Sequence, residues 1–421
     1  MNANIVNQEK PEYEDFLIAK VCVADRTGFD IDLNDVNPIL KEHQKLIVAW
    51  ACQGGLRAIF AAFGLGKSVI QLEVIRLCML RDGCDGLIVL PLGVRQEFTR
   101  DAAMLGIETK FIRRAEEIEP GKIHLTNYET IRDGKLDPTL FGAVSLDEAS
   151  ILRGFGGTKT FREFMATLAG DDKRDMHSRV RTAGVKYRFV ATATPSPNEY
   201  IELLAYAAYL GIMDVGQAKT LFFKRDSTKA DKLTLHAHKE QEFWLWVASW
   251  ALFVQRPSDL GCSDEGYTMP ELDVRWHEIP ADHEHAGEDW NNQLMTFKKH
   301  AIGVVESSRE KRESLPHRID KMLELIAEDP LANRLIWHDL ERERYAIEKA
   351  IPSSVSVYGS QDLEAREKAI IDFSNGEFQY LAAKPSIAGS GCNFQRHCHH
   401  AIFLGIGFKF NDFIQAIHRI K

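Results

Sequence analysis

The chain has 421 residues, of which 45% are hydrophobic and 27% are charged. These values are ordinary for a folded protein and exclude disordered, collagen-like and disulfide-scaffold classes, while the length predicts two or three domains. The net charge of -9 does not by itself indicate nucleic-acid binding, although residues 153–188 are locally basic, and a local basic stripe can hold phosphates.

Neither a membrane span nor a secretory signal is expected. The most apolar stretch, residues 47–63, is interrupted by polar and charged side chains. The first sixteen residues, MNANIVNQEKPEYEDF, are acidic and lack an apolar core segment. The seven cysteines are widely spaced and form no C-x-x-C pair, which favours reduced thiols and a cytoplasmic location.

Two sets of strand-like apolar runs alternate with helical patterns along the chain. The first set is 56–60, 86–90, 143–147 and 187–191, and the second is 334–338, 354–358, 379–383 and 401–404. Helical patterns lie between them, at 69–81, 201–210 and 363–373. Strands separated by helices predict parallel sheets, so two such sets predict two α/β domains in tandem.

The boundary between these domains is predicted in the Pro- and Gly-containing segment 256–273. The predicted domains are residues 1–256 and 257–421, with a helical insertion near 205–253 in the first. The Trp-rich stretch 242–253 is predicted to be helical. Its tryptophans are interpreted as core anchors of this insertion rather than as a platform for stacked bases, because they lie in an apolar run.

The strongest local signal is the segment AAFGLGKS at 61–68, with a strand before it and a helix after it. This is the context of a phosphate-binding loop that binds ATP. Gly64, Leu65 and Gly66 form the loop, Lys67 is expected to reach the β- and γ-phosphates, and Ser68 is expected to bind Mg²⁺. The alternative, a glycine-rich turn with a surface lysine, fits the flanking strand and helix less well.

An acidic pair follows about 80 residues later, where the strand of AVSLDEAS at 143–150 ends in Asp147 and Glu148. At the carboxyl end of a parallel strand, these side chains face the ligand crevice. Asp147 is expected to hold Mg²⁺, and Glu148 to orient or deprotonate the attacking water, which are roles that phosphoryl transfer requires.

Further short segments follow one another along the chain in an order that is hard to produce by accident. They are LKEHQKLIVAW (40–50), IVLPLGV (88–94), TNYETIR (126–132), RFVATATPSPNEY (188–200), RLIWHDLERE (334–343), VYGSQDLEAREKAIIDF (357–373), AGSGCNF (388–394) and QAIHR (415–419). Together with the phosphate loop and the acidic pair, they resemble the motifs of superfamily 2 helicases of the DEAD/DEAH type, most closely Swi/Snf-type DNA translocases. A phage or bacterial type is expected.

This resemblance covers residues 40 to 421 and implies two tandem RecA-like P-loop domains with ATP in the cleft between them. It implies that Gln44 reads adenine, that Gly391 belongs to the nucleotide site and that Arg419 is an arginine finger. It also implies that Thr192, Thr194 and Gln415 couple the domains. The implied nucleic-acid contacts are Pro91, Thr126, Asn127, Gly359 and Ser360.

The last motif departs from the family pattern Q-x-x-G-R-x-x-R, because His418 stands at the glycine and the second arginine would follow Lys421. The chain is therefore expected to be truncated within this motif.

The sequence thus predicts an enzyme, an ATPase of the helicase or translocase type that uses ATP and Mg²⁺ and binds DNA, double-stranded rather than single-stranded. One alternative is an RNA helicase of the same superfamily. Another is a nucleotide-binding module of a larger DNA-modification or defence protein, with a fused or associated methyltransferase or nuclease. A small-molecule kinase would leave the second domain unexplained.

Overall fold

The computed structural model describes residues 23–153, 162–165, 184–196, 199–225, 233–267, 271–279, 310–389, 394–407 and 410–420. The chain divides into two compact units. The first comprises Met1–Pro91 and Phe98–Tyr267, and the second comprises Leu92–Glu97 and Thr268–Lys421. The division after Tyr267 falls inside the segment 256–273, whereas the predicted division after residue 256 stays a prediction.

The first unit is built on a parallel sheet of seven strands. In chain order they are β1 (Leu56–Ala61), β2 (Gly86–Leu90), β3 (Thr109–Phe111), β4 (Ile123–Asn127), β5 (Ala143–Asp147), β6 (Tyr187–Ala191) and β9 (Ala251–Val254), and their order across the sheet is β3-β4-β2-β5-β6-β1-β9. Strands β2, β4, β5 and β6 are buried along their whole length, as expected for a parallel sheet covered on both faces. All four strands predicted in this unit are present, while β3, β4 and β9 were not predicted.

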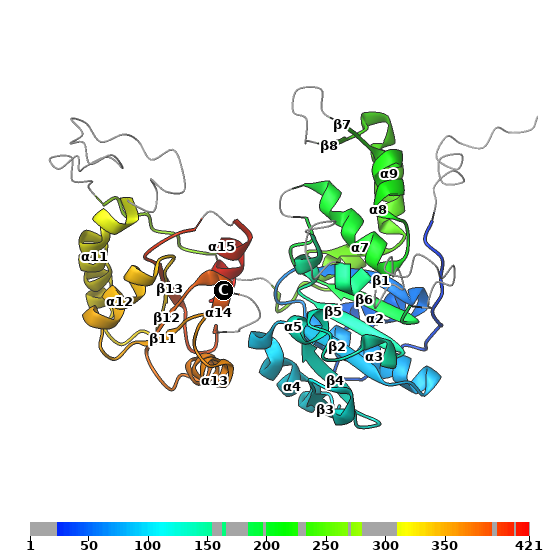
Figure 1. Cartoon of the computed structure of the whole chain (residues 1–421), viewed down its shortest axis with the longest axis horizontal. Helices are drawn as coiled ribbons and strands as arrows, with labels where there is room; N and C mark the ends of the chain where they lie inside the picture. Colours follow the sequence, from blue (N-terminus) through cyan, green and yellow to red (C-terminus); the bar gives the residue numbers. More distant parts are fainter. Residues whose placement is uncertain are drawn as a thin grey trace, which may run out of the picture. The chain divides into compact units, whose positions relative to one another are not determined.

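Helices cover both faces of this sheet (Figure 1). The helices before the insertion include α2 (Glu42–Gly54), α3 (Lys67–Asp82), α4 (Arg95–Met104) and α5 (Tyr128–Arg132). Short 3-10 helices connect the elements at Leu92–Val94, Ala115–Glu117, Pro138–Leu140, Ala149–Arg153, Tyr200–Glu202, Ala237–Lys239 and Pro257–Leu260. Helix α3 packs on β2 and β5, while Ala58 and Phe60 of β1 share a core with α7 (Leu203–Leu210).

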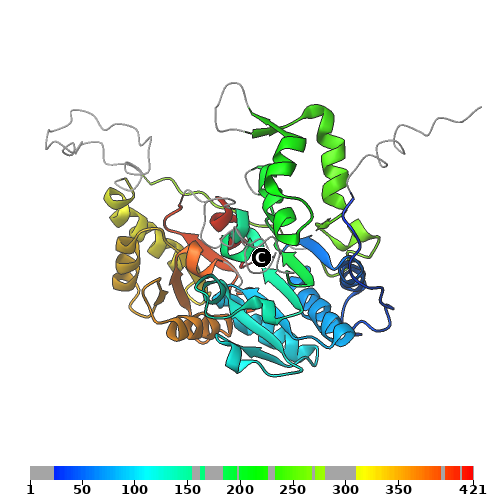
Figure 2. The same cartoon turned by 45° about the vertical axis from the view of Figure 1, so that its right-hand side comes forward.

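The region predicted as a helical insertion contains α7, α8 (Val215–Phe222), the antiparallel hairpin of β7 (Phe223–Arg225) and β8 (Leu233–Leu235), and α9 (Glu240–Ala248). Figure 2 shows these helices and the hairpin together, in green. The helical prediction for 242–253 was wrong at its end, because Ala251–Val254 forms β9 and pairs in parallel with β1. Trp246 and Trp250 are fully buried in the core, which confirms their interpretation as core anchors.

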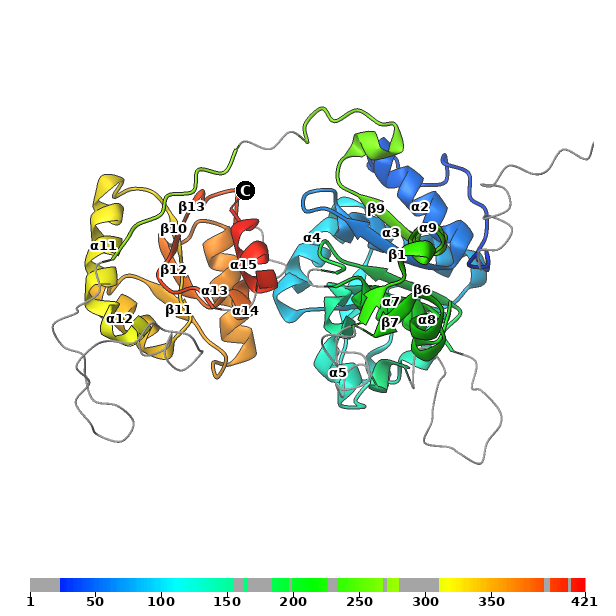
Figure 3. The same cartoon turned by 90° about the horizontal axis from the view of Figure 1, so that it is seen from above.

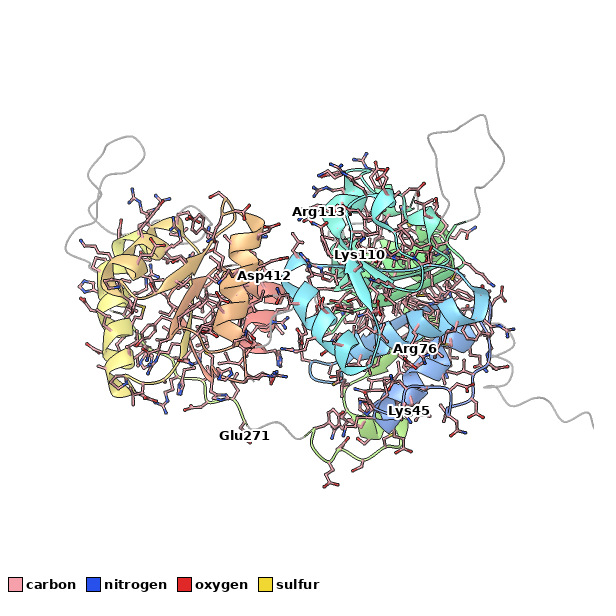
Figure 4. All side chains as sticks on the ribbon, turned by 90° about the horizontal axis from the view of Figure 1, so that it is seen from below. Lys45, Arg76, Lys110, Arg113, Glu271 and Asp412 are labelled. Carbon is pink, nitrogen blue, oxygen red and sulfur yellow. The ribbon has the colours of Figure 1, made fainter. Side chains whose placement is uncertain are left out.

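The exposed edge of the first sheet carries charged side chains. Lys110 lies on the edge strand β3, and Arg113 follows it closely in the chain (Figure 4). The ammonium of Lys110 pairs with Glu119 at 2.6 Å. Charges of this kind oppose the addition of a further strand from another chain.

The second unit has a smaller parallel sheet with helices on both faces. Its strands are β10 (Arg334–Trp337), β11 (Val355–Val357), β12 (Tyr380–Ala383) and β13 (His400–Phe403), in the order β11-β12-β10-β13. Figure 3 shows α11 (Leu315–Glu328) and α12 (Glu341–Ala350) on one face, and α13 (Leu363–Ser374), α14 (Pro385–Ala388) and α15 (Phe410–Ile417) on the other. Alternate residues of β10 enter two cores, since Ile336 packs with Met322 and Ile347, and Leu335 and Trp337 pack with Phe373. The predicted fold class of two tandem α/β domains with parallel sheets is confirmed.

His338 directly follows β10 and is completely buried. Neither of its ring nitrogens has a hydrogen-bond partner among the residues that the structure describes. Burial lowers the pKa of His338 from 6.5 to about 4, because a charged imidazolium would lose its hydration. The native second unit therefore holds this imidazole neutral under conditions in which an unfolded chain would protonate it.

The pH dependence of stability should report this imidazole. Between pH 6.5 and about 4 the unfolded chain binds a proton that native His338 does not, so stability falls as the pH decreases through this window. The loss approaches about 3 kcal/mol below the window, since one pKa unit corresponds to about 1.4 kcal/mol. His338→Leu should remove this part of the dependence, while His317→Leu, which removes an exposed imidazole of α11, should retain it. Denaturant unfolding of the three proteins at about pH 7.5 and about pH 5 measures the effect, and equal slopes for parent and His338→Leu would contradict it.

Candidate functional site

The predicted phosphate loop lies between β1 and α3. Gly64 and Gly66 have φ angles of 83° and 77°, in the left-handed region that favours glycine. Gly66 is the N-cap of α3, so the positive end of this helix lies at the loop. The ammonium of Lys67 donates hydrogen bonds to the carbonyls of Ala61 at 3.1 Å and Ala62 at 3.2 Å. The loop therefore combines glycine turns, a helix N-terminus and a lysine, which together suit a phosphate chain.

Gln44 of α2 supports this loop from the side. Its Nε2 donates to the carbonyl of Leu65 at 3.2 Å, and its Oε1 accepts from the main-chain N–H of Lys41 at 2.9 Å. A Cβ atom at Gly66 would lie 2.3 Å from Gln44 Nε2, so a larger residue there would displace this amide from its position against the loop. The structure thus places Gln44 against the phosphate loop, where its side-chain amide is hydrogen-bonded to a loop carbonyl.

The two carboxylates are at the carboxyl edge of the same sheet. Asp147 ends β5, which neighbours β6, and β6 neighbours β1, from which the phosphate loop emerges. The carboxyl ends of adjacent parallel strands meet at one edge, which is where ligands bind in such sheets. The phosphate loop, the acidic pair and the threonine motif that follows β6 are therefore gathered at one place in the first unit.

A buried hydrogen-bond chain holds Asp147. Ser145 donates to Oε1 of Gln71 at 2.6 Å, and Nε2 of Gln71 donates to Oδ1 of Asp147 at 2.8 Å. The hydroxyl of Tyr128 donates to the main-chain oxygen of Asp147 at 2.6 Å. Burial, together with the neighbouring charge of Glu148, raises the pKa of Asp147 to about 6. A nearby cation strongly stabilises the ionised form of such a carboxylate, because the cation offsets the free-energy cost of burying the negative charge.

Glu148 adopts a backbone conformation that residues other than glycine rarely adopt. Its φ of 48° is the only positive φ of a non-glycine residue among those that the structure describes. Thr192 and Ser150 each donate a hydroxyl hydrogen bond to Oε1 of Glu148 at 3.1 Å. Backbone strain of this kind costs about 1–3 kcal/mol and concentrates at functional sites, which marks Glu148 as a positioned group.

The threonine motif contacts Glu148 because of the strand register. Asp147 of β5 lies opposite Ala191 of β6, so the next residues along the two strands, Glu148 and Thr192, are neighbours. The hydroxyl of Thr192 also accepts a hydrogen bond from the main-chain N–H of Thr194 at 3.1 Å. A change in the conformation of the threonine motif would therefore alter the hydrogen bond between Thr192 and Glu148.

The oxygen donors at this edge fit Mg²⁺. A serine hydroxyl at the start of α3 and an aspartate at the end of β5 are hard oxygen donors, which Mg²⁺ prefers, together with the phosphates of a nucleotide. Ser68 and Asp147 would hold this ion. Within the described parts of the chain, no group of three or more His, Cys, Asp or Glu side chains forms a separate metal site.

In the second unit, the predicted finger residue Arg419 lies two residues after α15. Its Nε donates to the carbonyl of Gly389 at 2.6 Å, and its main-chain oxygen accepts from Phe394. Gln415 is a buried residue of α15. Gly391 lies outside the described residues. Arg419 is thus positioned by hydrogen bonds to the main chain of Gly389 and Phe394.

The five residues implied as nucleic-acid contacts fall into two groups. Pro91 is half-buried after β2, and Gly359 and Ser360 are exposed after β11. Thr126 is fully buried and donates its hydroxyl to the carbonyl of Ile112 at 2.8 Å. Asn127 is also buried, and its side-chain amide bonds Glu129 and Thr130 of α5. The side-chain polar atoms of Thr126 and Asn127 are therefore engaged within the unit, and the assignment of these two residues as nucleic-acid contacts stays a prediction.

Other expectations concern the surroundings of the site. None of the helices in the described portion is long and apolar enough to cross a membrane. Cys52, Cys78, Cys84, Cys262 and Cys398 are free thiols. The basic stretch 153–188 lies largely outside the described residues.

Known protein families provide no match to this sequence, and neither do curated proteins. Solved structures do. The SWI2/SNF2 ATPase core of Sulfolobus solfataricus in complex with dsDNA is 16% identical, with a TM-score of 0.45, covering 89% of this chain and 83% of that chain. A Dbp5 variant of S. cerevisiae bound to RNA and ADP BeF3 is 13% identical, with a TM-score of 0.48, covering 90% and 84%. Identities and TM-scores this low say nothing about the chemistry of this chain, which depends on its own residues.

Proposed function

We propose that this chain is the core of an ATP-dependent nucleic-acid translocase that acts on double-stranded DNA. The observation that carries the proposal is the gathering of Lys67, Asp147 and Glu148 at one sheet edge, with Thr192 bonded to Glu148. A phosphate loop alone would suit many nucleotide-binding proteins. The hydrogen bond between the threonine motif and Glu148 would let a change at the nucleotide site alter the conformation of the threonine motif.

The proposed roles follow from the positions of these groups. Main-chain N–H groups of the loop and the N-terminus of α3 bind phosphate oxygens, and Lys67 exchanges its bonds to loop carbonyls for the β- and γ-phosphates. When bound, Mg²⁺ neutralises charge on the phosphates. Glu148, fixed by two hydroxyl groups, orients the attacking water and accepts its proton as the γ-phosphate leaves.

The second unit supplies the remaining charge in this proposal. Arg419 stabilises the developing charge on the transferred phosphoryl group, and Gln415 takes part in coupling the two domains. Pro91, Gly359 and Ser360 contact the nucleic-acid backbone. Contacts of this kind position a duplex and do not specify its sequence. A cytoplasmic location is consistent with the free thiols.

ATPase activity in the presence of different nucleic acids tests this function. We expect double-stranded DNA to stimulate hydrolysis, equally for two unrelated sequences, and single-stranded DNA and RNA to stimulate it less. Lys67→Ala measured beside the parent excludes a contaminating ATPase. Stimulation by RNA alone would favour an RNA helicase instead. ATP binding without hydrolysis under any of these conditions would favour a nucleotide-binding module of a larger protein.

Binding to DNA should weaken as salt increases, because neutralised phosphates release their counterions. The logarithm of the association constant should fall linearly with the logarithm of salt concentration, with a slope of about -0.9 per neutralised phosphate. A salt titration of binding to a labelled duplex measures this slope. An affinity that does not change with salt would contradict backbone contacts as the basis of binding.

A further inference from the structure

The hydroxyl of Ser68 has a partner that the family resemblance did not indicate. Ser68 Oγ donates to Oδ2 of Asp101 at 2.5 Å. Ser68 is the second residue of α3, and Asp101 belongs to α4, so two different helices of the first unit meet through this bond. A hydroxyl that donates to a carboxylate forms a short, charge-assisted hydrogen bond.

This bond determines how the serine oxygen is oriented. A serine hydroxyl has one hydrogen and two lone pairs, and a cation can be bound only by a lone pair. Because the hydrogen points to Asp101, the lone pairs of Oγ are directed elsewhere. Without such a partner, a serine in the first turn of a helix hydrogen-bonds readily to nearby backbone groups. The bond to Asp101 thus keeps the hydroxyl of Ser68 from hydrogen-bonding to the backbone of α3.

The other carboxylate of the site does not perform this task in the structure. Oδ1 of Asp147 is held by Gln71, in the chain of bonds that begins at Ser145. The two oxygen donors expected to hold Mg²⁺ therefore have separate supports. Gln71 holds Asp147 from α3, and Asp101 holds Ser68 from α4.

We propose that Asp101 is a positioning residue for Mg²⁺–nucleotide binding, and that it acts through the hydroxyl of Ser68. The proposal rests on the proposed function, because it assigns Ser68 to the metal. Groups that orient a metal ligand through a hydrogen bond change metal affinity by about 10–100-fold when they are replaced. An effect at the lower end is expected here, because Mg²⁺ is also held by the nucleotide.

Equilibrium binding of a fluorescent ADP to the full chain tests this role without relying on turnover. Binding is titrated with Mg²⁺, and the affinity is measured again in EDTA. Asp101→Ala should raise the Mg²⁺ concentration for half-maximal binding about ten-fold, and leave the affinity in EDTA close to that of the parent. Asp101→Asn should have a smaller effect, because its side-chain oxygen still accepts the serine hydrogen bond. Met104→Ala, at a half-exposed position of the same helix, is the matched control and should not differ from the parent.

A double-mutant cycle with Ser68→Ala shows whether Asp101 acts through the serine. If it does, the double variant should bind Mg²⁺ as weakly as Ser68→Ala alone, since effects on one interaction are not additive. Additive effects would overturn the proposal, and so would an unchanged Mg²⁺ requirement in Asp101→Ala, or an equal loss of affinity in EDTA. These results leave the proposed function intact if the parent binds nucleotide and hydrolyses ATP. A parent that binds no nucleotide with or without Mg²⁺ would refute the proposed function and the role of Asp101 together.

Discussion

Glu148→Gln is expected to lower ATP turnover by about 10²–10⁴-fold, the range typical of a lost general acid–base group, while ATP affinity stays near that of the parent. Glutamine keeps the shape of the side chain and can still accept the hydrogen bonds of Thr192 and Ser150. It cannot accept the proton of the attacking water. Since this interaction strengthens only as the bond to the γ-phosphate breaks, its loss should affect turnover rather than binding.

Lys67→Ala provides the contrasting case. The ammonium binds phosphate in the ground state, so its removal should weaken ATP binding by about 1.5–3 kcal/mol, or about 10–150-fold. Steady-state kinetics combined with equilibrium binding of ATP separates the two variants. Glu116→Gln, which neutralises an exposed carboxylate of the same unit outside the sequence motifs, serves as the control and should retain both properties. An equal loss of ATP binding in Lys67→Ala and Glu148→Gln would contradict the role of Glu148.

Arg419→Ala should reduce turnover at saturating DNA by about 10³-fold or more, because arginine fingers contribute about 10³–10⁵ to the rate of phosphoryl transfer. The guanidinium would act on charge that develops in the transition state, so ATP affinity should change little. Arg419→Lys should recover only part of the loss, because an ammonium lacks the planar donor fork of a guanidinium. The measurements are turnover and ATP affinity of both variants beside the parent.

The structure also provides a competing explanation that these experiments must separate. Arg419 donates to the carbonyl of Gly389, so its loss removes one hydrogen bond within the second unit. A hydrogen bond from a charged donor contributes about 1.5–3 kcal/mol to stability, and denaturant unfolding would detect its loss. Arg396→Ala, at an exposed position of the same unit, is the control for a lost surface charge. If Arg419→Ala unfolds readily and loses ATP affinity together with turnover, its role is structural and the finger assignment fails.

Much of the fold could be predicted because the buried strands of parallel sheets are continuous apolar runs. Leu56–Ala61, Gly86–Leu90 and Ala143–Asp147 were all found this way. Strand β3 escaped prediction because it is short and half-buried at an edge, so its pattern carries little signal. Strand β9 escaped because the apolar pattern of the preceding helix runs directly into it.

Exposed and buried polar side chains were harder to separate from the sequence. Thr126 and Asn127 lie in a motif that resembles a segment contacting the nucleic-acid backbone. In the structure, however, the hydroxyl of Thr126 donates to the carbonyl of Ile112 in a neighbouring segment. Polar residues near the end of a strand look the same in the sequence whether they face a ligand or a neighbouring loop. Only the packing of β4 in the sheet shows which of the two applies.

The sequence by itself determined the phosphate loop, since Gly64, Gly66, Lys67 and Ser68 all lie within the segment 64–68 and their conformation depends on local backbone freedom and on the helix that starts there. It also determined the acidic pair at the end of an apolar strand. Only the tertiary structure decided which side chains hold these groups in place. Gln71 and Asp147 are 76 residues apart in the chain, Glu148 and Thr192 are 44 apart, and Ser68 and Asp101 are 33 apart. Such partners are brought together by sheet order and helix packing, and no local pattern of residues encodes a hydrogen bond between them.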